Sequence, residues 1–318
     1  MGKIAFVFPG QGSQTVGMAK ELSNEHKEVK AVVESADKKL GYSLSKLMFE
    51  GPQEELTLTY NAQPALLTSS ISILQVLEKA GIKADFAAGH SLGEYSALVA
   101  AGAISFEDAV YTVHMRGKYM EEAIPAGEGS MAAVLGLEES LLQQACLEAT
   151  EESGPVQLAN LNCPGQIVIS GSANGVAVAS EKAKEKGAKR VIPLVVSGPF
   201  HSSLMEPAAS KLKDTLSTIK IIDTSIPVIA NVNADIMTGA NEITNKLVEQ
   251  LYSPVRWEQS VEKMIDLGVD TFVEIGPGKV LSGLIKKVNR KVTTIPVYDI
   301  ETLEKAIEYF KEEGISNA

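Results

Sequence analysis

Residues 85–103 read DFAAGHSLGEYSALVAAGA, and this stretch decides both the fold class and the candidate chemistry. Residues 85–88 predict a short strand, and residues 94–103 predict a helix of small residues. Between them, Gly89-His90-Ser91-Leu92-Gly93 fits the pattern G-x-S-x-G, which places a serine at the strained apex of a strand-to-helix turn. The flanking glycines are needed because a Cβ atom at either one would clash with neighbouring backbone. We therefore predict that Ser91 is an enzymatic nucleophile.

The start of the following helix suits this role, because its exposed N–H groups and its dipole favour negative charge beside the serine hydroxyl. In that geometry the backbone N–H of Leu92 is a natural oxyanion donor. The alternative interpretation of the pattern is an ordinary glycine-bounded turn with a serine that caps the helix.

A serine nucleophile needs a base, and the chain has four histidines to supply one. His26 lies in a charged stretch that we predict to be a solvated helix. His90 is the neighbour of the nucleophile, where its ring is expected to point away from Ser91, and His114 lies on a predicted helix as a core or surface residue. His201 lies in the turn Gly-Pro-Phe-His-Ser-Ser, which can reach over the sheet. We therefore favour His201 as the base, with a structural histidine as the alternative.

The segments on either side of the nucleophile turn alternate between apolar strands and helices. We predict strands at 3–8, 227–231 and 271–275, and helices at 64–80, 106–123 and 279–288. Pro64 suits the first turn of its helix. The alternation predicts a mostly parallel sheet covered on both faces, in an α/β-hydrolase-like domain. Ligands of such sheets bind at the carboxyl ends of the strands, where we expect the glycine-rich turns at 10–12, 89–93 and 276–278.

Between residues 128 and 197 the pattern changes to that of a separate small unit. We predict a strand, a helix, two strands, a helix and a strand, at 130–135, 138–150, 156–161, 166–170, 174–186 and 189–196. This βαββαβ order is the ferredoxin-like one. We therefore predict an α/β-hydrolase-like catalytic domain from residues 1–127 and 198–318, and an inserted ferredoxin-like subdomain from residues 128–197, with glycine-containing hinges between them.

The composition is that of an ordinary globular chain, with 45% hydrophobic and 22% charged residues among 318. The net charge of −11 argues against nucleic acid or an anionic membrane surface as the main partner. There is no apolar run of eighteen residues, and the apolar stretch at the N-terminus is too short for a signal peptide, so a cytoplasmic protein is expected. Cys146 and Cys163 have neither disulfide-framework nor metal-ligand spacing and are expected to be ordinary intracellular thiols.

Six segments together resemble the malonyl-CoA:acyl-carrier-protein transacylases of bacterial type II fatty-acid synthesis and, more broadly, the acyltransferase domains of polyketide synthases. They are FPGQGSQ at 8–14, GHSLGEY at 89–95, Arg116-Gly117, NLNCPGQIVISG at 160–171, GPFHS at 198–202 and EIGPG at 274–278. Each segment alone is only modest evidence for the resemblance. Their joint occurrence in the family's order, over nearly the whole chain, is highly specific.

The resemblance implies a serine–histidine pair. Ser91 looks like the acyl-accepting nucleophile, and His201 looks like the general base and acid. Gln250, within VEQL at 248–251, resembles the residue whose backbone carbonyl orients the histidine, so that no triad aspartate is needed. Simple packing is the alternative for Gln250.

The resemblance also implies how the acyl group is held. Gln11 and Leu92 look like the residues whose backbone amides form the oxyanion hole, and Arg116 resembles the arginine that clamps the free carboxylate of a malonyl group. A planar guanidinium suits that task because it grips a carboxylate with two parallel hydrogen bonds, which a lysine does not. The alternatives are an ordinary turn residue for Gln11 and a solvated helix arginine for Arg116.

The implied reaction transfers a malonyl group from malonyl-CoA to the phosphopantetheine thiol of acyl carrier protein, by a ping-pong mechanism through a malonyl-serine ester. It supplies extender units for fatty-acid synthesis. No metal or redox cofactor is implied, since malonyl-CoA and the carrier protein are both substrates. By the same resemblance, Phe200 before His201 suggests malonyl over branched extender groups, and a free-standing chain is expected to be a monomer.

Acyl carrier proteins are acidic, and this chain is acidic too, so docking requires a local basic patch. We predict that patch at Lys286, Lys287, Arg290 and Lys291. A second candidate, on the inserted unit, consists of Lys182, Lys184, Lys186, Lys189 and Arg190. An ordinary solvated face is the alternative for either run of charge.

Two other functions remain open from the sequence. The pattern G-x-S-x-G also occurs in esterases and lipases, whose folds place an acid between the serine and the histidine in chain order, so a serine hydrolase of another substrate is the first alternative. A catalytically silent binding subunit of a synthase complex is the second. Arg116 and the Gln11 turn count against the hydrolase, and the intact set of Ser91, His201 and Arg116 counts against the silent subunit.

Overall fold

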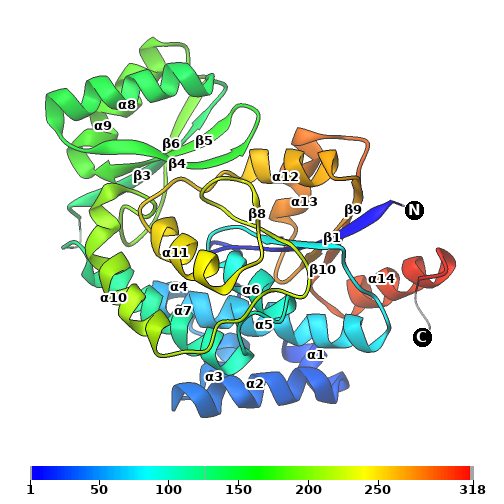
Figure 1. Cartoon of the computed structure of the whole chain (residues 1–318). Helices are drawn as coiled ribbons and strands as arrows, with labels where there is room; N and C mark the ends of the chain where they lie inside the picture. The colour runs from blue at the N-terminus through cyan, green and yellow to red at the C-terminus, as the bar shows by residue number, and fades with distance from the viewer. Residues whose placement is uncertain (1, 126, 316–318) are drawn as a thin grey trace.

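The computed structural model describes residues 2–125 and 127–315, and it contains two separate β-sheets (Figure 1). The larger sheet has six strands in the order β10-β9-β1-β2-β7-β8. Their bounds are Thr293–Val297 (β10), Val269–Ile275 (β9), Lys3–Phe8 (β1), Phe86–Gly89 (β2), Val228–Ile229 (β7) and Ile236–Met237 (β8). The first five run parallel to their neighbours, and β8 runs antiparallel to β7. The prediction of a mostly parallel sheet is therefore confirmed.

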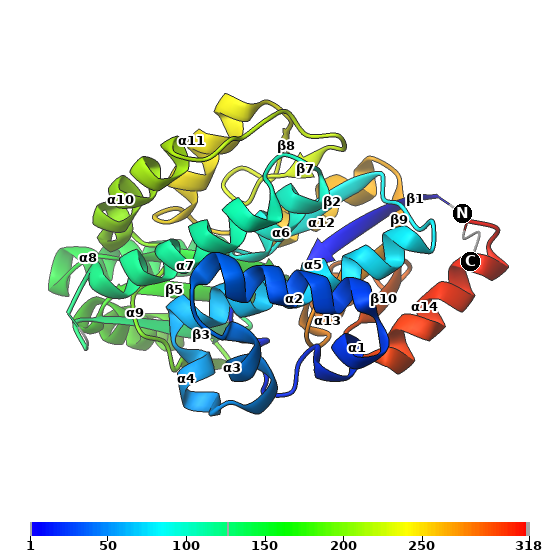
Figure 2. The same ribbon diagram turned by 90° about the horizontal axis from the view of Figure 1, so that it is seen from below.

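Both faces of the larger sheet are buried. Along β1, Phe6 and Phe8 face one hydrophobic core while Ala5 and Val7 face another, as expected when successive side chains point to opposite faces. The second core contains residues of α12 (Trp257–Asp266) and α13 (Val280–Val288). The helices that contribute residues to the first core include α2, which lies in front in Figure 2. They are α1 (Lys20–Glu25), α2 (Lys27–Leu40), α3 (Leu44–Glu50), α4 (Gln53–Thr57), α5 (Thr59–Lys79), α6 (Gly93–Ala100), α7 (Phe106–Glu122), α10 (Glu206–Ser217), α11 (Ala240–Gln250) and α14 (Ile300–Glu312). Within the two described ranges, no helix is both long and apolar enough to cross a membrane.

The smaller sheet lies in the segment predicted to be an inserted unit. Its elements follow the predicted βαββαβ order: β3 (Gly129–Leu135), α8 (Glu139–Ser153), β4 (Val156–Cys163), β5 (Gln166–Ser172), α9 (Ala173–Glu185) and β6 (Arg190–Pro193). The strands pair antiparallel in the order β4-β5-β3-β6. Helices α8 and α9 pack against this sheet around a core of their own, at the upper left of Figure 1.

One helix begins earlier than the sequence indicates. The helix expected at 64–80 is α5, which begins at Thr59, so Pro64 lies inside the helix and the prediction that it occupies the first turn is wrong. The reason is a cap from another element. The carboxylate of Glu121, on α7, accepts a hydrogen bond from the Thr59 N–H at 2.7 Å and so satisfies one of the free donors at the helix start.

The proline inside α5 explains the role of one histidine, His114. Pro64 has no N–H to offer the Tyr60 carbonyl one turn earlier. His114 Nδ1, on α7, donates to that carbonyl instead, at 2.8 Å. His114 therefore has a structural role, in which it repairs the hydrogen bond that the proline removes.

Two strands are shorter than predicted. The strand expected at 227–231 is limited to β7, because Ala230 already belongs to a turn that is closed by a backbone hydrogen bond to Asp235. The strand expected at 189–196 is limited to β6. Leu194 N still bonds the Met131 carbonyl, and the chain then leaves the sheet.

Strand β4 joins the smaller sheet to the rest of the molecule. Val255 donates to the Ala159 carbonyl at 2.8 Å and accepts from the Leu161 N–H at 2.9 Å, which forms a parallel bridge between the two parts. The Gln157 side chain, also on β4, donates to the backbone carbonyl of His201 at 3.3 Å. The segment that carries the predicted base thus lies at this junction.

Candidate active site

The nucleophile turn joins the end of β2 to the start of α6. Ser91 has a φ of 50°, in the left-handed region that residues other than glycine rarely adopt, so the backbone is strained at the apex as the pattern predicts. A Cβ atom on Gly89 would lie 1.8 Å from the carbonyl carbon of Gly93, and one on Gly93 would lie 2.1 Å from the carbonyl oxygen of Phe8. Both glycines are therefore required by the close approach of neighbouring backbone.

Asn231 fixes this turn from the loop after β7. Its Oδ1 accepts from the Ser91 N–H at 2.8 Å, and its Nδ2 donates to the Gly89 carbonyl at 2.7 Å. These two bonds satisfy backbone groups that the sharp turn leaves without partners in regular structure. Asn231 was not predicted as a site residue, because it lies 140 positions from Ser91 and no motif marks its segment.

His201 lies against the nucleophile in the arrangement of a base. Its Nε2 is 2.7 Å from Ser91 Oγ, and its Nδ1 donates to the backbone carbonyl of Gln250 at 2.8 Å. Because a carbonyl can only accept, Nδ1 carries the proton and Nε2 presents its lone pair to the serine hydroxyl. Burial, together with the charge of Arg116, lowers the pKa of His201 to about 3, so the imidazole is neutral at neutral pH.

The other three histidines serve elsewhere. His26 was expected within a helix, but it lies at the junction of α1 and α2. His90 turns its ring toward the inserted unit, where its Nε2 is 2.8 Å from Asn162 Oδ1. His114 holds the carbonyl in α5 described above. Of the four histidines, all of which lie within the described residues, His201 is the one that reaches the nucleophile.

Arg116 is the second functional side chain beside Ser91, and it comes from α7. It is 1% exposed, so it is not a solvated helix arginine. Its Nη2 donates to Ser91 Oγ at 3.2 Å and to Gln250 Oε1 at 2.9 Å, and its Nη1 donates to Gln63 Oε1 at 2.7 Å. Its Nε is buried with no hydrogen-bond partner among the described residues. A buried guanidinium whose partners are neutral oxygens is suited to bind an anion that enters the site.

Glu94 is a buried acid that was not singled out from the sequence. It is 0% exposed, and its carboxylate accepts from the Asn231 N–H at 3.1 Å and from Gln250 Nε2. Burial raises the pKa of Glu94 to about 7, although these hydrogen bonds and the charges of Arg116 and Lys246 oppose the shift. The one available signal was its position, since Glu94 is the only charged residue in the otherwise small and apolar segment 93–103.

One cavity of about 420 Å³ contains the reactive groups. Ser91, His201 and Arg116 line it, and so do Gln11 and Leu92. The Gln11 side chain donates to Thr59 Oγ1 at 3.2 Å, which fixes the glycine-rich turn after β1. Asn160 and Leu194 of the inserted unit also line the cavity, so it lies between the two parts of the molecule. With Gln250, which bonds both His201 and Arg116, the structure brings all six predicted site residues together.

Neither cysteine lines this cavity. Cys146 and Cys163 are buried and free, and they lie in different hydrophobic cores. Burial raises the pKa of Cys146 to about 12 and also raises that of Cys163, which keeps both thiols protonated and unreactive. In the part of the chain that the structure describes, no group of three or more His, Cys, Asp or Glu side chains is placed to hold a metal ion.

Comparison with known proteins identifies close relatives. A malonyl CoA-acyl carrier protein transacylase of Bacillus subtilis (strain 168) is 64% identical over 314 residues, which are 99% of each chain. A solved malonyl CoA-acyl carrier protein transacylase of Clostridium perfringens superposes with a TM-score of 0.95 at 42% identity, over 98% of both chains. A structure described as a type II PKS acyl-carrier protein in complex with its malonyl-transacylase has a TM-score of 0.94 at 44% identity and covers 96% of this chain and 99% of that one.

A family model described as the acyl transferase domain matches residues 5–308. This range contains every candidate site residue, from Gln11 to Gln250. The similarity therefore extends over the larger sheet, the inserted unit and the cavity between them. The chain belongs to the acyl transferase family, and it is an acyltransferase.

Proposed function

We propose that this chain transfers the malonyl group of malonyl-CoA to the phosphopantetheine thiol of acyl carrier protein, and so supplies extender units for fatty-acid synthesis. One observation carries the proposal: Ser91 Oγ lies 2.7 Å from His201 Nε2 and 3.2 Å from Arg116 Nη2. A base and a cation at the same nucleophile suit an acyl group that ends in a carboxylate. The names of the relatives, malonyl CoA-acyl carrier protein transacylase, agree with such an acyl group.

In the first half of the reaction, His201 Nε2 removes the Ser91 proton as Oγ attacks the thioester carbonyl of malonyl-CoA. The backbone N–H groups of Gln11 and Leu92 hold the oxyanion of the tetrahedral intermediate. The carbon–sulfur bond then breaks, and His201 returns the proton to the departing sulfur. The products are a malonyl-serine ester and the CoA thiol.

In the second half, His201 takes the proton of the phosphopantetheine thiol as its sulfur attacks the ester carbonyl. The bond from the carbonyl to Ser91 Oγ breaks, and His201 returns the proton to the serine. The Gln250 carbonyl orients the imidazole in both halves, and Arg116 holds the malonyl carboxylate throughout. Malonyl-CoA and the carrier protein are the two substrates, and the proposed chemistry calls on no cofactor.

The surroundings of His201 argue against an esterase-type triad. In the α/β-hydrolases an aspartate or glutamate accepts the hydrogen bond from the second imidazole nitrogen. Here the backbone carbonyl of Gln250 accepts it, at 2.8 Å. The buried Arg116 also suits an acyl group with a free carboxylate better than a neutral ester. We therefore place the serine hydrolase second.

The proposal is tested by following the acyl group through both halves. Incubation with malonyl-CoA is expected to add the mass of one malonyl group to Ser91, detected by peptide mass spectrometry, and Ser91→Ala is expected to give no adduct. Phosphopantetheinylated carrier protein should then accept the malonyl group faster than water releases it, whereas carrier protein without phosphopantetheine should not. The transferase proposal fails if no adduct forms, or if the malonyl group is lost only to water.

We also propose that the two sheets belong to two domains with the predicted boundaries. The catalytic domain, 1–127 and 198–318, is α/β-hydrolase-like, and the inserted domain, 128–197, is ferredoxin-like. In support, each sheet has its own core, and the strand order β4-β5-β3-β6 combines with the βαββαβ chain order in the smaller one. The nucleophile turn between a parallel strand and a helix supports the assignment of the larger one.

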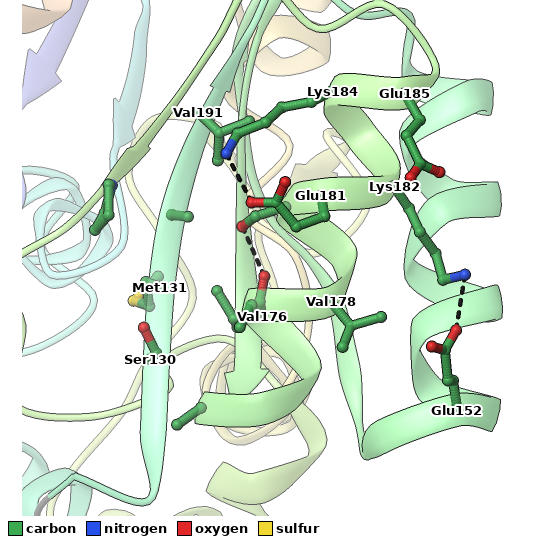
Figure 3. A pocket seen from close by; sticks show the side chains of 15 residues that line it. Ser130, Met131, Glu152, Val176, Val178, Glu181, Lys182, Lys184, Glu185 and Val191 are labelled. Atoms are coloured by element: carbon green, nitrogen blue, oxygen red, sulfur yellow. Dashed lines mark hydrogen bonds and ion pairs between the residues drawn. The ribbon is translucent and has the colours of Figure 1, made fainter.

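We propose that the basic set at Lys286, Lys287, Arg290 and Lys291 docks the acidic carrier protein. The rival set on the inserted unit is partly neutralised, because three of its five cations, Lys182, Lys184 and Lys186, pair with Glu152, Glu181 and Glu148 at 2.8, 2.7 and 3.0 Å. Two of these ion pairs are visible in Figure 3, beside a cavity of about 600 Å³ on the inserted unit. In contrast, Lys287 Nζ bonds the neutral Gln166 Oε1 at 3.1 Å, so its charge remains available at the junction of the two parts.

Charge reversal tests this docking surface. The double variant Lys287→Glu and Lys291→Glu is expected to raise the KM for carrier protein roughly tenfold at low salt, with the rate of Ser91 malonylation by malonyl-CoA unchanged. The matched control is Lys182→Glu with Lys184→Glu, which is expected to leave that KM within about twofold. An unchanged KM in the first variant would refute the proposed surface, and a larger effect in the control would favour the set on the inserted unit.

A further inference from the structure

Glu94 is buried beside the candidate site and has no part in the reaction proposed above. We propose that Glu94 is a positioning residue for acyl-group selection: its carboxylate is the internal counter-charge of Arg116, held one amide group away by Gln250, and it sets how strongly Arg116 binds the carboxylate of an acyl group. The inference rests on the proposed function, because it concerns how that same site selects its acyl group.

The carboxamide of Gln250 connects the two charges. Its Oε1 accepts from Arg116 Nη2 at 2.9 Å, and its Nε2 donates to a carboxylate oxygen of Glu94. Only this orientation suits both neighbours, because a guanidinium can only donate and a carboxylate can only accept. The same Nε2 lies 3.0 Å from the Ser91 carbonyl and 3.4 Å from Asn231 Oδ1, two further acceptors that fix the same orientation.

The intervening amide decides what the counter-charge can do. A direct ion pair with Glu94 would occupy the donors with which Arg116 can grip a substrate carboxylate. A guanidinium buried without any nearby anion would be strongly unfavourable. With Glu94 one amide away, the buried cation is stabilised, while its direct partners are the neutral oxygens of Gln63, Gln250 and Ser91. A substrate carboxylate can replace such partners more readily than it can replace a carboxylate.

The charged and titratable groups around Glu94 come from three helices. The charges of Arg116 on α7 and Lys246 on α11 act on it, and Tyr95 is its neighbour on α6. Asn231, in the loop after β7, adds a backbone N–H. Burial works against the charge of Glu94 and raises its pKa to about 7, whereas the hydrogen bonds and the two cations favour the charge. Glu94 therefore changes its protonation in the neutral range.

The sign of the effect follows from competition for one positive charge. An ionised Glu94 attracts Arg116 and weakens its hold on a malonyl carboxylate. A protonated Glu94 leaves that charge to the substrate, so malonyl binding is stronger at lower pH. By linkage, binding of the malonyl carboxylate favours the protonated form of Glu94 to the same extent. An acetyl group has no carboxylate and is not affected by this exchange.

The experiment compares the rates at which malonyl-CoA and acetyl-CoA acylate Ser91, measured by intact mass at low conversion. The ratio of the two rates is used because the CoA phosphates titrate alike in both substrates. In the unmodified protein the malonyl-to-acetyl ratio is expected to rise roughly three- to tenfold as the pH falls from about 8 to about 6. Glu94→Gln is expected to give, at both pH values, the higher ratio that the unmodified protein reaches at the lower pH. Glu94→Asp is expected to keep the pH dependence.

The matched control is Glu274→Gln. Glu274 is also a buried carboxylate, and it accepts hydrogen bonds from the backbone N–H groups of Leu281 and Ser282 at 2.9 and 2.7 Å. It makes no hydrogen bond with Arg116 or Gln250 in the described part of the chain, so its substitution is expected to leave the ratio and its pH dependence unchanged. A general effect of removing a buried carboxylate would instead appear in both variants.

The possible results distinguish failure of the role of Glu94 from failure of the proposed function. A pH-independent ratio in unmodified protein that forms the malonyl adduct would overturn the role of Glu94, and so would a Glu94→Gln ratio that stays the same or falls. Failure of the unmodified protein to form any malonyl adduct would overturn the proposed function instead. If Glu94→Gln does not fold, the pH series on the unmodified and Glu94→Asp proteins decides alone, because a flat ratio in both overturns the inference.

Discussion

The site has two halves that are built in different ways. The reacting half is Ser91 with His201, and both residues adopt strained backbone, with φ values of 50° and 59°, in sharp turns. The contact that orients the base is made to a backbone carbonyl, that of Gln250. The holding half is Arg116 with the side chains of Gln250 and Glu94. These residues lie in the regular helices α6, α7 and α11, and their contacts with one another join side chain to side chain.

The two halves also differ in charge. The reacting half is kept neutral, because burial lowers the pKa of His201 to about 3. The holding half contains a buried cation, Arg116, and an acid, Glu94, whose pKa is raised to about 7. From this difference we expect that changes in the reacting half remove the rate for every acyl group, whereas changes in the holding half alter which acyl group is accepted.

The largest effect is expected from His201→Ala. Without the base, the rate of Ser91 acylation should fall by about 10³- to 10⁴-fold, because proton transfer and orientation of the nucleophile are lost while the oxyanion donors remain. The loss should be equal for malonyl-CoA and acetyl-CoA. Adduct formation over time, followed by intact mass, measures both. A loss confined to malonyl-CoA would contradict the division into two halves.

His114→Ala is the matched control for this variant. His114 is also a buried histidine on a packed element, but its contact is the Tyr60 carbonyl left free by Pro64. Its removal is expected to lower the free energy of unfolding by about 1–3 kcal/mol, as for an unsatisfied buried carbonyl. The acylation rate of the folded protein should change little. Denaturant unfolding and the same mass assay separate the two outcomes.

The reacting half could be predicted from the sequence because its determinants are local. The glycines at 89 and 93 and the serine between them are required by one turn, and a five-residue pattern records that requirement. The turn that carries His201 lies within another short motif. The alternation of strands and helices was equally local, and the mostly parallel sheet and the βαββαβ unit followed from it.

The remaining features depend on contacts between distant segments. The start of α5 depends on Glu121 of another helix, so the proline appeared to mark the first turn when it does not. Strand β10 contains Pro296, which disfavours a strand in sequence and is tolerated because β10 is at the edge of the sheet. The hydrogen bond between Glu94 and Gln250 spans 156 positions, and the motif around Ser91 gives no sign of it.

A smaller effect is expected from the holding half, with Arg116→Ala. Loss of the guanidinium should lower the malonyl-to-acetyl ratio of acylation rates by roughly 100-fold, which corresponds to about 2.7 kcal/mol for a charge-assisted pair in a buried site. The rate with acetyl-CoA should change by only a few fold, because Ser91 and His201 keep their 2.7 Å contact.

Arg116→Lys separates charge from geometry in the same assay. A lysine restores the positive charge but not the planar pair of donors, and it cannot satisfy Gln63 and Gln250 together in the way that Nη1 and Nη2 do. We therefore expect the lysine variant to have a malonyl-to-acetyl ratio of only about a tenth of that of the unmodified protein.

If Arg116→Ala keeps the malonyl preference while it unfolds at a lower denaturant concentration, then Arg116 is only a buried structural cation. In that case the two halves of the site would not divide rate from selection. If Arg116→Lys recovers the full ratio, charge alone selects the acyl group, and the two-donor grip is not needed.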